Sequence, residues 1–168
     1  MAKLFMTKTG RVLGVLLMLL PMCGKTVGQD APQLEYVCEL RVTCDPAVEV
    51  GPTARGRRVV IPIMGGTFEG PRMRGVVLSG GADYQLVCDS LGRTELEAIY
   101  CIRTDDGVTI HIRNAGVLTW GKSGQYFRTV PRFEAPVGSG YEWLNNAVFV
   151  CVPEVRSEYI SLKVWMVK

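Results

Sequence analysis

The side chains that could do chemistry in this 168-residue chain are carboxylates, tyrosines, arginines and one histidine, spread over separate segments. Asp83 or Glu134 could serve as a general base, and Tyr100 or His111 as a proton donor. An arginine in the same hollow would stabilise developing negative charge. Since phosphate-loop and nucleophile-elbow motifs do not accompany these residues, the pattern indicates a kind of site and leaves the catalytic residues and the reaction open.

The same residue types also fit a binding module, in which a few polar groups converge among apolar walls. The candidate ligand-binding residues are Tyr36, Asp83, Tyr84, Tyr100, His111, Arg113, Arg128, Glu134, Trp143 and Asn145. An arginine would meet an anionic or carbonyl oxygen of the ligand, and the aromatic rings would form the walls. Two alternatives stay open: the arginines pair with carboxylates such as Glu134 and only hold the fold together, or the chain is a structural or interaction protein.

Metal and cofactor sites are not predicted, because His111 is the only histidine and has no ligand-type residue at metal-binding spacing. Cysteines are the remaining reactive side chains. After a predicted leader, five remain: Cys38, Cys44, Cys88, Cys101 and Cys151. An odd number leaves at least one free thiol, the pairing stays open, and most are expected to be small buried apolar residues.

The elements that must position these residues are strands. From Leu34 onward the apolar residues recur with a period of two, and turn residues interrupt them every eight to twelve positions. The predicted strands are 34–44, 58–63, 67–69, 75–78, 84–88, 95–103, 109–114, 125–134, 146–152 and 159–167. This pattern predicts an all-β domain of about eight to ten strands, either a barrel or a sandwich. Such a barrel holds either packed side chains or one small ligand.

One hairpin predicts which residues face inward. If Asp106-Gly107 is a two-residue turn, Tyr100 lies opposite Arg113 and Ile102 opposite His111. A turn near Leu91 then extends the pattern to the preceding strand. The predicted inner face is Tyr84, Leu86, Leu96, Ala98, Tyr100, Ile102, His111 and Arg113. A shift of one residue at a turn would reverse the strand beside it.

Residues 1–28 have the order of a secretory signal peptide: basic residues, then an apolar run over 12–20, then small residues. The run is too short to span a membrane, which needs about 20 apolar residues. We therefore expect an exported protein, periplasmic or extracellular, with a mature domain of residues 29–168. Lipidation of Cys23, which would anchor the protein to a membrane, and a buried helix in the mature domain are the alternatives.

The charge balance depends on that leader. The whole chain has 19 basic and 16 acidic residues, but four of the basic residues lie in the leader and leave 15. The mature domain is therefore near neutral, which gives no electrostatic indication of a nucleic-acid partner. A small molecule is the partner that the pattern favours, and the oligomeric state stays open.

Four blocks in order, GGTFEGPRMRGVVLSGGADY, IRTDDGVTIHIRNAG, YFRTVPRFEAP and YEWLNNAVFV, resemble the family known as domain of unknown function 3237. The resemblance covers about residues 34–168. It implies a single closed or nearly closed antiparallel β-barrel of the calycin or lipocalin type, related in shape to small-molecule carriers, and no settled activity. It also implies where a shared site lies, in five residue pairs: Asp83 and Tyr84, Arg113 and Asn114, Arg128 and Thr129, Phe133 and Glu134, Trp143 and Asn145.

Overall fold

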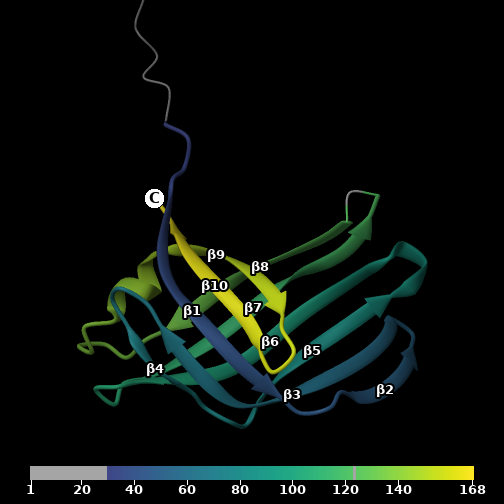
Figure 1. Ribbon diagram of the computed structural model, residues 1–168, viewed down its shortest axis with the longest axis horizontal. Coiled ribbons are helices and arrows are strands. Elements are labelled where there is room, and N and C mark those ends of the chain that lie inside the picture. The colour runs from purple at the N-terminus through teal and green to yellow at the C-terminus, as the bar shows by residue number, and fades with distance from the viewer. Residues whose placement is uncertain (1–29, 123) are drawn as a thin grey trace, which may run out of the picture. The chain divides into compact units, whose positions relative to one another are not determined.

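In the computed structural model, residues 30–122 and 124–168 are described, and those from Pro32 to Lys168 form one compact unit. Ten strands make up a single antiparallel sheet that closes on itself because β1 pairs with β3 as well as with β10 (Figure 1). The elements are β1 (Leu34–Cys44), β2 (Val48–Thr53), β3 (Gly56–Glu69), β4 (Arg74–Val77), β5 (Gly81–Cys88), η1 (Asp89–Leu91), β6 (Arg93–Thr104), β7 (Thr109–Gly121), β8 (Gly124–Glu134), η2 (Glu142–Asn146), β9 (Val148–Val155) and β10 (Ile160–Val167).

The ten strands occupy eight positions around the barrel. β2 continues β1 along the same edge of β3, and β4 and β5 share the position between β3 and β6. The predicted all-β barrel is therefore confirmed, with eight antiparallel positions. Two predicted strands, 58–63 and 67–69, are one strand, β3, which continues through Gly65 and Gly66 at φ values of 149° and 136° that favour glycine.

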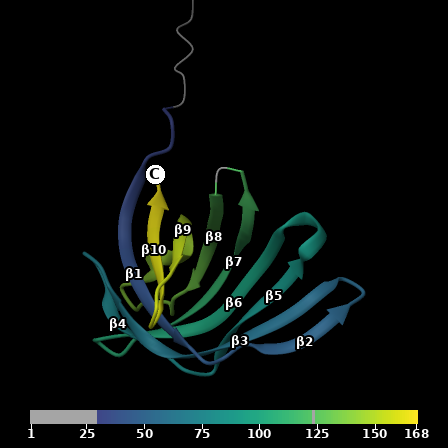
Figure 2. The same cartoon turned by 45° about the vertical axis from the view of Figure 1, so that its right-hand side comes forward.

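The two ends of the barrel differ. At one end the interior is filled by a hydrophobic core, in which Phe133 and Phe149 pack edge to face at 4.9 Å and Leu144 of η2 is buried beneath them. At the other end β3, β5, β6 and β7 extend past the turn between β9 and β10, so the wall is taller on that side (Figure 2). We call this end the open end of the barrel.

The predicted register of β6 and β7 is wrong by one residue. Thr104 pairs with Val108 around a three-residue turn, because the Thr104 hydroxyl donates to Val108 O and accepts from Val108 N at 2.9 Å. Gly107 adopts φ +89°, as the third position of such a turn requires. Tyr100 therefore lies opposite Ile112, and both Arg113 and His111 face outward.

The predicted register of β5 and β6 is also wrong by one residue. Cys88 pairs with Arg93 around a four-residue loop, in which η1 ends at Gly92 in the left-handed conformation. Asp83 therefore lies opposite Ala98, where Tyr84 was predicted. The inward direction of Leu96, Ala98, Tyr100 and Ile102 on β6 is confirmed, whereas Tyr84 and Leu86 belong to the outer face.

The predicted signal peptide and Cys23 lie outside the described residues. Within the described part of the chain the five cysteines are all free, and Cys38 and Cys151 are fully buried while Cys44 is exposed. Burial raises the pKa of the thiols of Cys38 and Cys151 to about 12, so both stay protonated at neutral pH.

Among the described residues, 30–122 and 124–168, there is no helix that is long and apolar enough to span a membrane.

Candidate functional site

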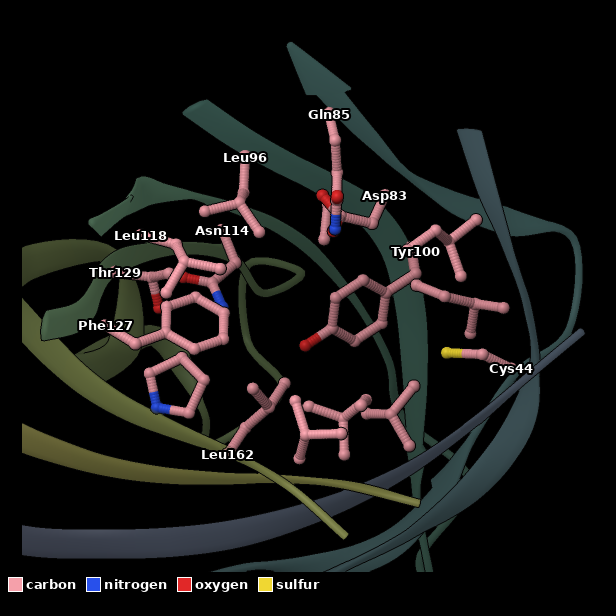
Figure 3. A pocket seen from close by; sticks show the side chains of 17 residues that line it. Cys44, Asp83, Gln85, Leu96, Tyr100, Asn114, Leu118, Phe127, Thr129 and Leu162 are labelled. Carbon is pink, nitrogen blue, oxygen red and sulfur yellow. The ribbon is translucent and has the colours of Figure 1, made fainter. Parts of the chain in front are cut away.

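The open end of the barrel contains a cavity of about 280 Å³ (Figure 3). Its walls are mostly aliphatic and come from β1, β3 and every strand from β5 to β10. The lining residues are Val42, Cys44, Ile61, Ile63, Asp83, Gln85, Leu96, Ala98, Tyr100, Asn114, Leu118, Phe127, Thr129, Pro153, Val155, Ile160 and Leu162. Its volume is just below the usual range of ligand pockets, which is about 300–1,000 Å³, so the cavity suits only a small molecule.

The pairing of β5, β6 and β7 determines where the polar side chains of this cavity lie. Asp83 pairs with Ala98, and Ala98 pairs with Asn114, so these three residues form one row across β5, β6 and β7. Opposed residues project to the same face, and two strand spacings put the outer two Cα atoms about 10 Å apart. The small side chain of Ala98 leaves space between the carboxyl group and the amide group.

The Asp83 carboxyl group is held in the cavity wall by two donors. Gln85 Nε2 donates to one oxygen at 2.8 Å, and the backbone N–H of Glu97 donates to the other at 3.1 Å. Burial raises the pKa of Asp83 above its usual value, and the two hydrogen bonds offset part of that effect. The carboxyl group is therefore a stronger base than an exposed aspartate and is fixed in direction.

Three further polar side chains face the same space. Tyr100 is buried, burial raises the pKa of its hydroxyl, and the hydroxyl points into the cavity in Figure 3. Asn114 and Thr129, on the neighbouring strands β7 and β8, are each only 4% exposed. Asn114 Oδ1 and Thr129 Oγ1 have no hydrogen-bond partner among the described residues. Buried polar atoms without partners are rare in folded proteins.

The only charged side chain among the residues that line this cavity is acidic. The lining includes Asp83 and no lysine, arginine or histidine. Elsewhere in residues 30–122 and 124–168, groups of three potential metal-ligating side chains do not occur. A ligand of this cavity would therefore meet hydrogen-bonding groups and one carboxyl group, without a cation to neutralise a negative charge.

Four of the sequence candidates lie on the outer surface. Arg113 Nε donates to Glu97 Oε1 at 2.6 Å, and the Arg113 side chain is 57% exposed. His111 Nδ1 lies 3.7 Å from Glu134 Oε1, with exposures of 39% and 79%. Arg128 donates to the Phe127 carbonyl and lies over the Tyr126 ring. The prediction that Arg113 and His111 face the lumen is wrong, because the turn that sets their register differs from the one expected. Arg128, on β8, also lies outside the lumen.

The two tyrosine candidates outside the cavity are surface residues as well. Tyr84 is 43% exposed, and Tyr36 is 41% exposed and packs against the ring of Trp165 at 6.0 Å. Neither tyrosine lines the cavity.

Trp143 and Asn145 belong to the closed end of the barrel. Trp143 packs against Phe149 and carries the Arg72 guanidinium over its ring at 3.7 Å. Asn145 accepts from Ala135 N at 2.8 Å and donates to Ala135 O at 2.9 Å. These contacts attach η2 to the end of β8 and close the barrel there.

Among the polar residues of the cavity, Gln85 was not predicted, and Asn114 and Thr129 were indicated only by the family resemblance. Asn114 and Thr129 stand next to Arg113 and Arg128 in the blocks that carry the family resemblance. A usable signal was present around Thr129: Phe127, Thr129, Pro131 and Phe133 alternate with charged residues at 128, 132 and 134. That alternation indicates an inward direction for the odd-numbered positions of β8.

A second hollow adjoins the cavity at its mouth. It shares Ile61 and Gln85 with the cavity, and Val59, Val87 and Trp120 are among its other lining residues. Trp120 is 66% exposed at the end of β7. The charged residues of this hollow are Glu49, Arg57, Asp89 and Arg93, and Arg57 pairs with both Glu49 and Asp89.

A closed eight-position antiparallel barrel with a small cavity at one end is the class of protein that these observations define. Residues 32–167 match the family described as Protein of unknown function (DUF3237). The chain belongs to this family, as the resemblance predicted.

Relatives share both sequence and fold. A UPF0311 protein of Clostridium acetobutylicum is 37% identical over 148 residues, which cover 79% of this chain and 92% of the relative. A crystal structure of a protein with unknown function from the same organism is 34% identical, with a TM-score of 0.77 over 83% of this chain and 99% of the other. A β-barrel-like protein from Acinetobacter baumannii is 28% identical, with a TM-score of 0.79 over 84% of this chain and 99% of the other.

Proposed function

We propose that this barrel binds a small, largely apolar molecule in its lumen, as lipocalin-like carriers do. One observation carries the proposal: the open end contains a cavity whose walls are aliphatic and aromatic and whose polar groups converge from β5, β6, β7 and β8. This composition is typical of ligand pockets. A barrel of this kind that served only as a structural element would gain stability by filling the same space with side chains.

The proposed setting is outside the cytoplasm, in the periplasm or beyond, and rests on the order of residues in the 1–28 segment. In that location, a carrier would bind small molecules of the surroundings before they reach the cytoplasm.

Binding is tested by thermal unfolding of the full chain against a library of small ring compounds. A ligand present at 100 times its dissociation constant stabilises the fold by about 2.7 kcal/mol. The variant Ala98→Leu places three more carbon atoms in the cavity and should lose the shift while still unfolding cooperatively. Tyr84→Ala, on the outer face of β5, is the matched control and should keep it. If Ala98→Leu responds to every compound as the unaltered protein does, the lumen is not the binding site.

An acid-base enzyme that uses the same cavity is the second candidate. It is favoured by the partly buried carboxyl group of Asp83, which shares the cavity with the Tyr100 hydroxyl. Asp83 would take a proton from the bound molecule, and Tyr100 would donate a hydrogen bond to an oxygen that gains negative charge. Glu134 and His111, which lie on the outer surface, are not part of this proposal.

Deuterium exchange separates the two candidates. A bound carbonyl compound incubated with the protein in D₂O would gain deuterium next to the carbonyl if Asp83 transfers protons. Mass spectrometry measures the uptake, and Asp83→Asn should abolish it without abolishing binding. Binding without uptake for every ligand identified would leave the carrier function and exclude the enzyme.

A further inference from the structure

Three buried polar atoms have no hydrogen-bond partner among the described residues: His111 Nδ1 on an outward-facing residue, and Asn114 Oδ1 and Thr129 Oγ1 on residues that line the cavity. The latter two indicate which part of a ligand the lumen recognises. Asn114 Oδ1 and Thr129 Oγ1 both lie in the cavity wall, on adjacent strands, in residues that are 96% buried. The Thr129 hydroxyl lies close enough to the Cys151 thiol to act against the rise in the pKa of the thiol that burial causes, but a thiol is a weak hydrogen-bond partner. The two oxygens themselves are buried, so a small rotation of each side chain would bring them to a ligand group in the cavity and give them the partner that the described residues do not.

We propose that the lumen selects a neutral ring compound with a free hydroxyl group, a phenol or an alcohol, and binds that hydroxyl group at Asn114 and Thr129. This inference rests on the proposed function, since it specifies the ligand of the same cavity. The ring would lie against Leu118 and Phe127, which line the cavity beside these two residues in Figure 3.

A hydroxyl group complements this pair of side chains because it both donates and accepts. An amide presents one acceptor and two donors, and a threonine hydroxyl presents one donor and two acceptors. A ligand O–H can therefore donate to the Asn114 amide oxygen and accept from Thr129, or donate to Thr129 and accept from the amide nitrogen. The complement holds for either orientation of the amide.

Anionic ligands are disfavoured by charge. The lining has no cationic side chain, and Asp83 faces the same space. A carboxylate or phosphate group would lose its hydration without gaining a counter-charge, which is strongly unfavourable. Arg113 and Arg128, which could have supplied one, point away from the lumen.

Cationic ligands fit less well than neutral ones. An ammonium group would be drawn to Asp83, whose oxygens already accept from Gln85 and from the backbone of Glu97. Asn114 Oδ1 and Thr129 Oγ1 would then stay without partners. The observation that points to a ligand at this site would be left unexplained.

The test compares four matched probes of one ring system with the full chain: 2-naphthol, its methyl ether, 2-naphthoate and 2-naphthylmethylammonium, together with a panel of smaller phenols in the same four forms. Dissociation constants come from ligand-observed NMR. We expect the hydroxyl form to bind about tenfold more tightly than the methyl ether, which is the effect of one hydrogen bond of about 1.4 kcal/mol. The anion should bind more weakly still.

Two isosteric variants identify the site. Asn114→Leu and Thr129→Val should each reduce the preference for hydroxyl over methyl ether to less than threefold. Both should also raise the melting temperature of the ligand-free protein, because each removes a buried polar atom that lacks a partner. Arg113→Ala and Arg128→Ala, on the same strands but facing outward, are the matched controls and should keep the preference.

The outcomes distinguish this inference from the proposed function. If the probes bind and the carboxylate or the ammonium form is preferred, the inference is overturned and the carrier function stands. If hydroxyl and methyl ether bind equally in both the unaltered protein and Asn114→Leu, water alone occupies the subsite and the inference is again overturned. If Asn114→Leu lowers the melting temperature, the amide has a structural partner and the inference is overturned. If none of the four forms of any ring system binds, both this inference and the proposed function are overturned.

Discussion

Gln85 donates a hydrogen bond of 2.8 Å to Asp83, two positions earlier on the same face of β5. The bond joins two polar side chains inside an otherwise apolar wall and fixes the direction of the carboxyl group. Because this carboxyl group is the only charged group of the lining, its ionisation controls how the lumen responds to pH.

Stability should therefore fall as pH rises through the titration range of Asp83. The folded-state pKa of Asp83 is raised by burial, so between the unfolded and folded pKa values the native state binds more protons than the unfolded state. The stabilisation of the protonated form is fully present below the unfolded-state pKa and is lost as pH rises through the folded-state pKa. Urea unfolding of the unaltered protein and of Asp83→Asn, from pH 4 upward, should show a loss that the variant lacks. Parallel pH profiles would contradict this assignment.

Replacing Gln85 by leucine should raise the pKa of Asp83 further. The substitution removes the donor that favours the charged form and leaves the backbone N–H of Glu97 as the remaining one. An NMR titration that follows the Asp83 carboxyl carbon measures the change directly. A pKa that is unchanged or lower in Gln85→Leu would mean that this hydrogen bond does not form in solution.

Asn145 should prove structural. Its side-chain amide makes two hydrogen bonds to the backbone of Ala135 and attaches η2 to β8, far along the barrel from the cavity. Asn145→Ala should cost about 1–3 kcal/mol in the free energy of unfolding, because it leaves backbone groups of Ala135 without partners. Ligand affinity should stay the same. An affinity loss with normal stability would return Asn145 to the list of site residues.

Gly116 should be intolerant of any side chain. A Cβ atom at this position would overlap the carbonyl oxygen of Arg128 and lie 2.6 Å from the Cα atom of Thr129, across the β7–β8 pairing. We expect Gly116→Ala to lower the free energy of unfolding by about 1–3 kcal/mol or more. The control is Gly121→Ala on the same strand, where a Cβ atom has nothing within 4 Å and the change should be neutral or slightly stabilising. Equal effects in urea unfolding would argue against the close approach of β7 and β8.

The ion pair of Arg113 and Glu97 should contribute little. Both side chains are partly exposed, at 57% and 36%, on the outer face of the barrel. A double-mutant cycle with Arg113→Ala and Glu97→Ala, measured by urea unfolding, should give a coupling of about 1 kcal/mol or less. Neither variant should change ligand binding. A large coupling or a loss of affinity would place this pair nearer to the lumen than the register allows.

Much of this architecture is visible in the sequence because strand patterns are local. The period of two along 34–44 and 95–103 predicts half-buried strands, and the turn residues between such runs predict their number. The inward direction of Leu96, Ala98 and Tyr100 follows from their alternation with Glu95 and Glu97. Family membership likewise follows from the sequence of four blocks and needs no coordinates.

The contents of the lumen were decided by the tertiary structure, through the lengths of two turns. The hydroxyl of Thr104 bonds across to Val108 and makes the loop one residue longer than Asp106-Gly107 alone, and Gly92 ends a four-residue loop after η1. Because side chains alternate with a period of exactly two, one residue at a turn exchanges every inward side chain of the next strand for an outward one. Asn114 therefore faces the cavity where Arg113 was expected, and Asp83 faces it where Tyr84 was expected. The lumen thus contains a carboxyl group and uncharged polar groups in place of the expected arginine.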